Sequence, residues 1–148
     1  MTAAILRRIA IALTFLLVPF ASLAFAGDPH GTWLTDDGKA RIRVADCGGA
    51  LCGNIIWLKE PNDETGKPKT DQHNADAAKR SRPILGVPIV LGMKPTSTPD
   101  KWAGEVYNAE DGKTYSGSIT LIGPSKLNLE GCALGGLVCK TKVWTRAN

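Results

Sequence analysis

Two arginines in a polar stretch are the residues of this chain best suited to bind an anion. Arg80 and Arg82 lie two positions apart just before Pro83, and a proline disfavours helix at the residue that precedes it. In an extended backbone both guanidinium groups point to one face and could clamp a carboxylate or a phosphate. Solvent-facing or carboxylate-paired arginines are the simpler interpretation. The binding hypothesis places these arginines at the polar end of a ligand site with three aromatic walls: Trp102, Tyr107 and Tyr115.

The same stretch offers weaker candidates for other chemistry. Asp71, His73 and Asp76 carry oxygen and nitrogen atoms that could bind a metal ion, but a solvated loop explains them at least as well. His73 has no evident nucleophile to activate as a general base. No serine-hydrolase, zinc-protease, P-loop or dinucleotide-binding motif occurs in the sequence. We therefore predict no metal and no cofactor, and binding rather than enzymatic activity.

Four cysteines indicate disulfide bonds in an oxidising compartment: Cys47, Cys52, Cys132 and Cys139. Of the three pairings that four cysteines allow, the spacing favours Cys47–Cys52 and Cys132–Cys139. Two-residue hairpin loops at Gly49-Ala50 and Gly135-Gly136 would place the cysteines of each pair opposite one another. A zinc site is disfavoured by the spacing within the pairs, which is four residues for Cys47 and Cys52 and six for Cys132 and Cys139, because six exceeds the usual two to four.

The first 26 residues have the three parts of a signal peptide. Arg7 and Arg8 precede an apolar run from Ile9 to Phe20, and Ala24-Phe25-Ala26 provides a small-x-small cleavage site. The run is too short to span a bilayer, which takes about 20 residues. Cleavage after Ala26 would leave residues 27–148 as one domain, with no transmembrane span in the mature form and a location in the periplasm or outside the cell.

Cleavage would remove two of the 18 basic residues and none of the 14 acidic ones, so the mature chain is only weakly basic. No basic block remains, which argues against a nucleic-acid partner.

Short β-favouring runs separated by turn signals predict an all-β fold. We expect about eight strands, at 31–35, 40–46, 53–59, 84–93, 101–107, 115–121, 126–130 and 138–146. The apolar run Ile55–Leu58 suggests a strand buried on both faces, and the polar stretch 61–82 predicts a long loop with a short helical turn near 75–79. By the two-residue alternation of a strand, Trp144 falls on the same face as Lys140 and Lys142. An apolar residue and two lysines on one face require a bulge or a change of environment along the last strand.

Mostly local connections favour a small antiparallel up-and-down β-barrel, because barrel closure removes exposed sheet edges. A two-sheet sandwich is the alternative.

Four segments together resemble the domain of unknown function 2147 family of bacterial secreted proteins. They are Gly31-Thr-Trp33, Arg80-Ser-Arg82-Pro83-Ile-Leu-Gly86, the run from Trp102 to Tyr115, and Gly131 with Trp144-Thr-Arg146. The resemblance implies a lipocalin-like, calycin-type barrel and no known activity. The usual Asp-Pro of the family appears here as Asn108-Ala109, so that turn is expected to differ. In lipocalins an arginine of the last strand packs across a tryptophan of the first, and Trp33 and Arg146 occupy the matching places as a structural closure.

Two functional hypotheses follow from these observations. In the first, the barrel binds a small apolar or amphipathic ligand, such as a fatty acid or a lipid fragment. In the second, side chains fill the barrel, and the protein has a structural or interaction role with another protein of the cell envelope.

Overall fold

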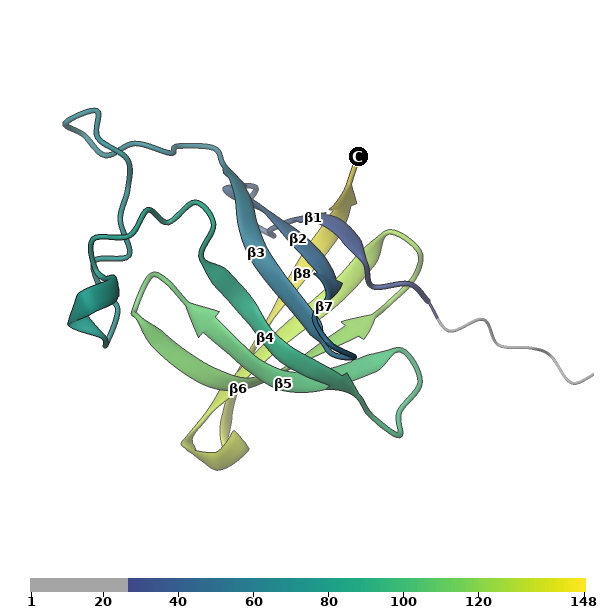
Figure 1. Ribbon diagram of the computed structural model, residues 1–148. Coiled ribbons are helices and arrows are strands. Elements are labelled where there is room, and N and C mark those ends of the chain that lie inside the picture. Colours follow the sequence, from purple (N-terminus) through teal and green to yellow (C-terminus); the bar gives the residue numbers. More distant parts are fainter. Residues whose placement is uncertain (1–26) are drawn as a thin grey trace, which may run out of the picture.

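The computed structural model describes residues 27–148, which form an eight-stranded antiparallel barrel (Figure 1). The strands are β1 (Gly31–Leu34), β2 (Ala40–Asp46), β3 (Leu51–Leu58), β4 (Pro88–Pro95), β5 (Lys101–Asn108), β6 (Lys113–Leu121), β7 (Lys126–Ala133) and β8 (Val138–Ala147). Each strand pairs with the next, and β1 pairs with β8 to close the barrel. The predicted up-and-down barrel is confirmed, and the sandwich alternative is wrong. The predicted signal peptide lies outside the described residues.

One cluster of apolar side chains occupies the inside of the barrel. It is built by alternation along the strands: Trp33 on β1 pairs with Ile42 on β2, and Ile119 on β6 pairs with Leu129 on β7. The fully buried members include Trp33, Ile42, Val44, Val90, Met93, Ile119 and Leu127. Burying each such side chain contributes about 1.5–3 kcal/mol, so this interior cluster stabilises the fold more than any single surface contact.

The expectation that Ile55–Leu58 is buried on both faces is wrong. Ile55 lies in the core, but Ile56 is 47% exposed and Trp57 is 38% exposed. The register between β2 and β3 shifts between Arg41 and Ile42, and this irregularity brings Trp57 opposite Arg41. The Arg41 guanidinium lies 5.0 Å from the centre of the Trp57 ring, so a cation–π contact on the outer surface replaces burial.

The last strand contains no bulge. Its pairing with β7 runs without a shift from Ala133–Val138 to Lys126–Thr145. The environment changes instead: Trp144 is buried, whereas the first six residues, Val138–Val143, are all exposed. The reason is that β1 is short and pairs with β8 only from Thr145 to Ala147.

The topology gives the barrel two different ends. The closed end holds residues 27–30 and three short turns, at 47–50, 96–100 and 122–125. The loop end holds the turns at 35–39, 109–112 and 134–137 together with the long β3–β4 loop, residues 59–87. Figure 1 shows this loop beside the β5–β6 turn, with its one 3-10 turn, η1 (Ala77–Lys79), where the sequence suggested a helical turn.

Both predicted disulfides are present, one at each end of the barrel. Cys132 and Cys139 are direct cross-strand partners, as expected, with Cα atoms 4.1 Å apart. The loop between them is longer than two residues, because the last strand pair is Ala133–Val138 and a second 3-10 turn, η2 (Leu134–Gly136), follows.

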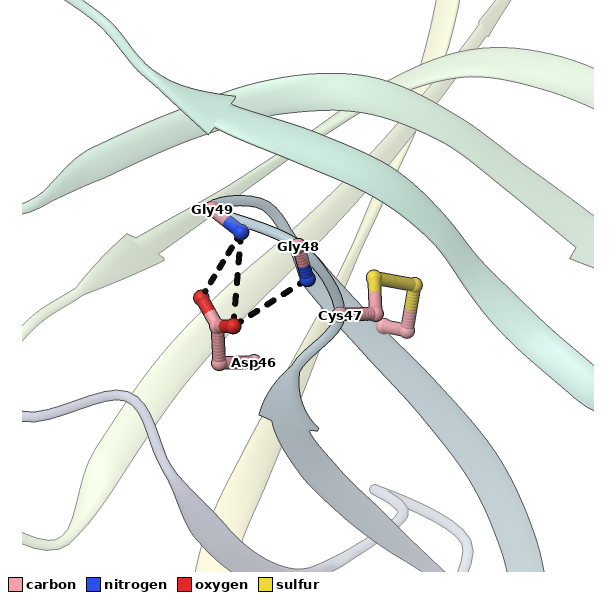
Figure 2. Close-up of a disulfide and its surroundings, with 5 residues drawn as sticks. Asp46, Cys47, Gly48 and Gly49 are labelled. Carbon is pink, nitrogen blue, oxygen red and sulfur yellow. Dashed lines mark hydrogen bonds between the residues drawn. A yellow bond between two sulfur atoms is a disulfide. The ribbon is translucent and has the colours of Figure 1, made fainter.

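The other disulfide differs from the expected geometry. The turn is centred on Gly48-Gly49 and not on Gly49-Ala50, so Cys52 lies opposite Ala45 and the Cys47–Cys52 bridge runs diagonally. Both glycines have positive φ, at 79° and 83°, a conformation that alanine adopts only at a cost. Figure 2 shows the Asp46 carboxylate accepting hydrogen bonds from both glycine N–H groups next to the disulfide.

Candidate functional site

The long loop is fastened to the barrel by a buried carboxylate. Asp71 is completely buried and accepts four hydrogen bonds, which satisfy both of its oxygens. The Tyr107 hydroxyl of β5 donates to Oδ1 at 2.6 Å. The Asn74 amide donates to Oδ2 at 2.8 Å, and Arg82 donates through Nε at 3.0 Å and Nη2 at 2.8 Å. We call these four residues the Asp71 cluster. A buried charge of this kind is tolerated only when it is fully paired and hydrogen-bonded.

The backbone around the Asp71 cluster explains why Asp71 and Arg82 meet. The Asp71 N–H donates to the Arg82 carbonyl at 2.9 Å, and Thr70 forms an isolated β-bridge with Pro83. The two ends of the segment between them are therefore held side by side. Arg80 turns back to donate from Nε to the Asn74 carbonyl at 2.8 Å.

The hydrogen bonds of the Asp71 cluster keep the Asp71 carboxylate ionised. Burial alone raises the pKa of Asp71, but the hydrogen bonds from Tyr107, Asn74 and Arg82 outweigh it, and the pKa lies below its usual value. Burial and the bond to Asp71 both raise the pKa of Tyr107. Tyr107 therefore stays a neutral donor and Asp71 a charged acceptor at physiological pH, which suits a fixed structural contact better than proton transfer.

The loop also fits tightly against the β5–β6 turn. Gly112 has a φ of 70°, and a Cβ atom at this position would lie 1.6 Å from the His73 carbonyl oxygen. No side chain can be accommodated at Gly112 unless the loop moves away. Within this turn the Tyr115 hydroxyl donates to Asp111 at 2.6 Å, a bond that raises the pKa of Tyr115.

A hollow of about 760 Å³ opens on the outer surface between the loop and the β5–β6 turn. Most of its lining residues are of polar types, and they include more acidic than basic groups. The lining residues are Glu60, Asn62, Asp63, Glu64, Lys69, Thr70, Gln72, His73, Ile84, Ala109 and Glu110. The hollow lies outside the barrel, and it contains none of the five residues predicted to form the ligand site.

The structure brings together only part of the predicted ligand site. Arg82 lies 5.9 Å over the Tyr107 ring, but its guanidinium is bonded to Asp71. Trp102 is the second residue of β5 and lies five residues from Tyr107, which corresponds to about 16 Å along a strand. It is partly buried against the core and pairs with Ile119. Tyr115 lies on β6 and is bonded to Asp111, so the five residues do not line one cavity.

Sequence reasoning did not find Asn74 as a site residue, and it considered Asp71 only as a metal ligand. The two lie three residues apart, a spacing that is common in turns, so the sequence carries no signal that they meet Tyr107. The one group of potential metal ligands within the described residues is Glu130, Cys132 and Cys139, and its two cysteines are joined in a disulfide.

The closed end carries the other polar cluster. The Arg146 guanidinium lies 4.2 Å from the centre of the Trp33 ring, which confirms the predicted contact. Arg146 donates to the carbonyls of Pro124, His30 and Asp28, and the Trp33 indole donates to the Pro29 carbonyl at 2.9 Å. Arg146 thus joins the N-terminal segment, the β6–β7 turn and β8.

These features define a lipocalin-like barrel: eight antiparallel strands, with a tryptophan and an arginine closing one end. One solved structure with this fold is Protein HP1028 from the human pathogen Helicobacter pylori, described as belonging to the lipocalin family. It matches with a TM-score of 0.70 and 21% sequence identity, over 82% of this chain and 84% of that one.

The chain belongs to the bacterial family described as "Uncharacterized protein conserved in bacteria (DUF2147)", whose model matches residues 31–146. This confirms the resemblance inferred from the sequence. Comparison with curated proteins gives no match. Among the described residues, no helix is both long enough and apolar enough to cross a membrane.

Proposed function

We propose that this protein is an exported, non-enzymatic interaction protein of the bacterial envelope, with the barrel as a filled scaffold and the loop end as its binding surface. The Asp71 cluster carries the proposal. Burying an ionised carboxylate costs several kcal/mol before its partners compensate it. A loop that only connects β3 to β4 needs no such arrangement, whereas a loop that must keep one shape for a partner does.

The N-terminal sequence and the disulfides support the exported location in this proposal. Residues 1–26 act as a signal peptide and are removed after Ala26, and the mature protein works in the periplasm. The two disulfides, each between cysteines on adjacent strands of one hairpin, fit an oxidising compartment.

Site-specific photo-cross-linking in living cells tests the binding surface. A photoreactive residue at Gln72 or Asn62 in the hollow should give a defined adduct in the periplasm, whereas one at the exposed Thr98 of the closed end should not. Asp71→Asn should weaken the adduct at Gln72, because the loop loses its anchor. Equal adducts at both ends, or none at the hollow, would contradict the proposal.

A small apolar or amphipathic ligand inside the barrel is the second candidate, and the lipocalin-like fold favours it. Titration with fatty acids, followed by tryptophan fluorescence, separates the two. The first proposal expects no saturable change, since Trp33 and Trp144 are packed in a filled core. Saturable binding that Arg80→Ala or Arg82→Ala weakens would favour the second candidate.

A further inference from the structure

The first six residues of β8 form an unpaired strand edge at the loop end. Val138–Val143 pair with β7 on one side only, because β1 ends at Leu34 opposite Thr145. No backbone hydrogen bond from any other described residue reaches this edge. All six residues are exposed, so the edge is open along its whole length.

The pairing geometry shows which backbone groups are free. The 4.1 Å Cα separation of Cys132 and Cys139 is typical of a non-hydrogen-bonded antiparallel pair. The N–H and C=O of Cys139 therefore point away from β7, and so do those of Thr141 and Val143 by the two-residue period. The next residues of β8 follow the same alternation of backbone direction. Thr145 pairs with β1, whereas the Arg146 N–H points to the β7 side and donates to the Ser125 carbonyl.

The side chains along the edge carry positive charge on one face. Lys140 and Lys142 lie opposite Gly131 and Leu129 of β7 and therefore share the face of the barrel interior. Lys142 binds Asp36 of the β1–β2 turn at 2.9 Å. Lys140 forms no salt bridge with any described residue. On the other face, Thr141 and Val143 offer β-branched side chains.

A second copy of the chain is a poor occupant of this edge. Antiparallel pairing of two β8 strands about Thr141 would place Lys140 opposite the Lys142 of the other copy, and like charges directly opposite are destabilising. Inward-pointing lysines also protect exposed edges against such pairing. Lys140, which has no salt-bridge partner among the described residues, selects an acidic side chain in the occupant. Lys142 already faces Asp36, with Asp37 and Glu110 also acting on its charge, so an acidic residue opposite Lys142 would compete with them.

We propose that the β8 edge binds an extended, acidic segment of a partner protein, which adds to the barrel as a further strand. Its backbone would pair with Cys139, Thr141 and Val143, and acidic residues at alternate positions would face Lys140 and, in competition with Asp36, Lys142. β-Branched residues between them would pack beside Thr141 and Val143. The Cys132–Cys139 disulfide holds the edge in its extended shape before binding. This inference rests on the proposed interaction function and names the chemistry of the partner.

Fluorescence anisotropy with synthetic peptides tests the proposal. A labelled peptide that alternates Glu with Val and Thr should bind the oxidised protein saturably, and a peptide with Lys in place of Glu should not. Thr141→Pro removes one N–H from the free edge and leaves the β7 ladder intact, so affinity should fall about tenfold or more. Thr141→Val keeps the N–H and should bind as the wild type does. Lys140→Glu should weaken the acidic peptide and favour the basic one.

Two outcomes would overturn this inference. One is equal binding by Thr141→Pro and Thr141→Val. The other is that the wild type does not bind the acidic peptide and that a Lys140→Thr, Lys142→Thr double variant self-associates. That result would mean that the lysines only protect the edge against pairing. Cross-linking at Gln72 does not involve β8, so an adduct there with no peptide binding would refute this inference and leave the proposed function standing.

A separate observation concerns the predicted cleavage site. The Gly27 backbone nitrogen donates to the Asp100 carboxylate at 2.6 Å, and Asp100 adopts a left-handed φ of 57° in the β4–β5 turn. A Cβ atom at Gly27 would lie 2.7 Å from Leu121 Cδ1, so the position suits glycine. Asp28 and Arg146 also line the hollow around Gly27, but Asp28 is bonded to His30 and Arg146 to backbone carbonyls.

We infer that Asp100 is the binding site for the new N-terminus created by processing. Hydrolysis of the Ala26–Gly27 amide adds water across the bond, leaving a carboxylate on Ala26 and an α-ammonium on Gly27. The same nitrogen then holds a positive charge next to Asp100. The inference rests on cleavage after Ala26, which N-terminal sequencing checks independently.

NMR titration of the mature protein tests the N-terminal ion pair. A carboxylate this close should raise the pKa of the Gly27 α-amine above the usual range of about 7.7–8.0. Asp100→Asn should return the pKa to that range, whereas Asp28→Asn should change it less. An α-amine pKa that is the same in the wild type and Asp100→Asn would overturn the inference, whatever the sequencing shows.

Discussion

The two ends of the barrel are held by opposite kinds of polar contact. At the closed end Arg146 keeps its charge over the Trp33 ring and donates to three backbone carbonyls in two segments, the N-terminal segment and the β6–β7 turn. At the loop end the buried charge is negative, and Asp71 gathers donors from its own loop and from one residue of β5. The first contact closes the core itself, whereas the second fixes one loop on the outside. Damage to the closed end should therefore unfold the whole barrel, and damage to the loop end should be partly local.

The largest effect is expected from Trp33→Ala. Trp33 is fully buried, so the truncation should lower the free energy of unfolding by about 3–5 kcal/mol. Arg146→Ala should cost less. The two losses should be non-additive in the double variant, because the side chains touch. Urea unfolding measures all three, and strictly additive losses would contradict coupling across the closed end.

Asp71→Asn should have the next largest effect, about 2–3 kcal/mol, because it leaves Arg82 without its counter-charge. Hydrogen exchange should increase mainly in residues 59–87. The bonds that lower the pKa of Asp71 stabilise the folded state fully above the unfolded pKa, and this stabilisation is lost as the pH falls through the folded value. The difference from wild type should therefore be constant at neutral pH and shrink below about pH 4. A difference that grows in acid would contradict this account.

The two disulfides allow the two ends of the barrel to be compared, because the chain segments that they close are similarly short. Replacing either pair by serine should cost about 2 kcal/mol, since both close short loops. The local result should differ: loss of Cys132–Cys139 should expose the β7–β8 arm to proteolysis, because β8 has no second neighbour there. The Asp46 hydrogen bonds should keep the β2–β3 turn intact after loss of Cys47–Cys52. Equal protease sensitivity at both sites would argue against an open β8 edge.

The smallest expected effect on stability comes from removing a tyrosine hydroxyl, and it should differ between Tyr107 and Tyr115. Tyr107→Phe removes a donor from buried Asp71 and should cost about 1–2 kcal/mol. Tyr115→Phe removes an exposed bond to Asp111 and should leave the unfolding midpoint unchanged. Equal losses would show that the Asp71 cluster is no more important than an ordinary surface contact.

The amino-acid sequence by itself determined the strand order, the disulfide pairs and the Trp33–Arg146 contact. These depend on local alternation, on short sequence separations or, for Trp33 and Arg146, on a family resemblance. It did not determine the register shift beside Trp57 or the centre of the Gly48-Gly49 turn. A one-residue shift moves side chains to the opposite face, but the continuous apolar run Ile55–Leu58 and the segment Gly48-Gly49-Ala50 have no alternation that favours one register over the next.

Only the tertiary structure decided the roles of the loop end. Arg82 was expected to face a ligand, but Asp71, Asn74 and Tyr107 meet it through a fold of the loop that no periodicity describes. Lys140 and Lys142 lie on the inward face of β8, as core residues do. They are nevertheless exposed, because β1 stops at Leu34. Where a strand ends relative to its neighbours is set by the closure of the whole barrel, and a single strand's sequence does not contain that information.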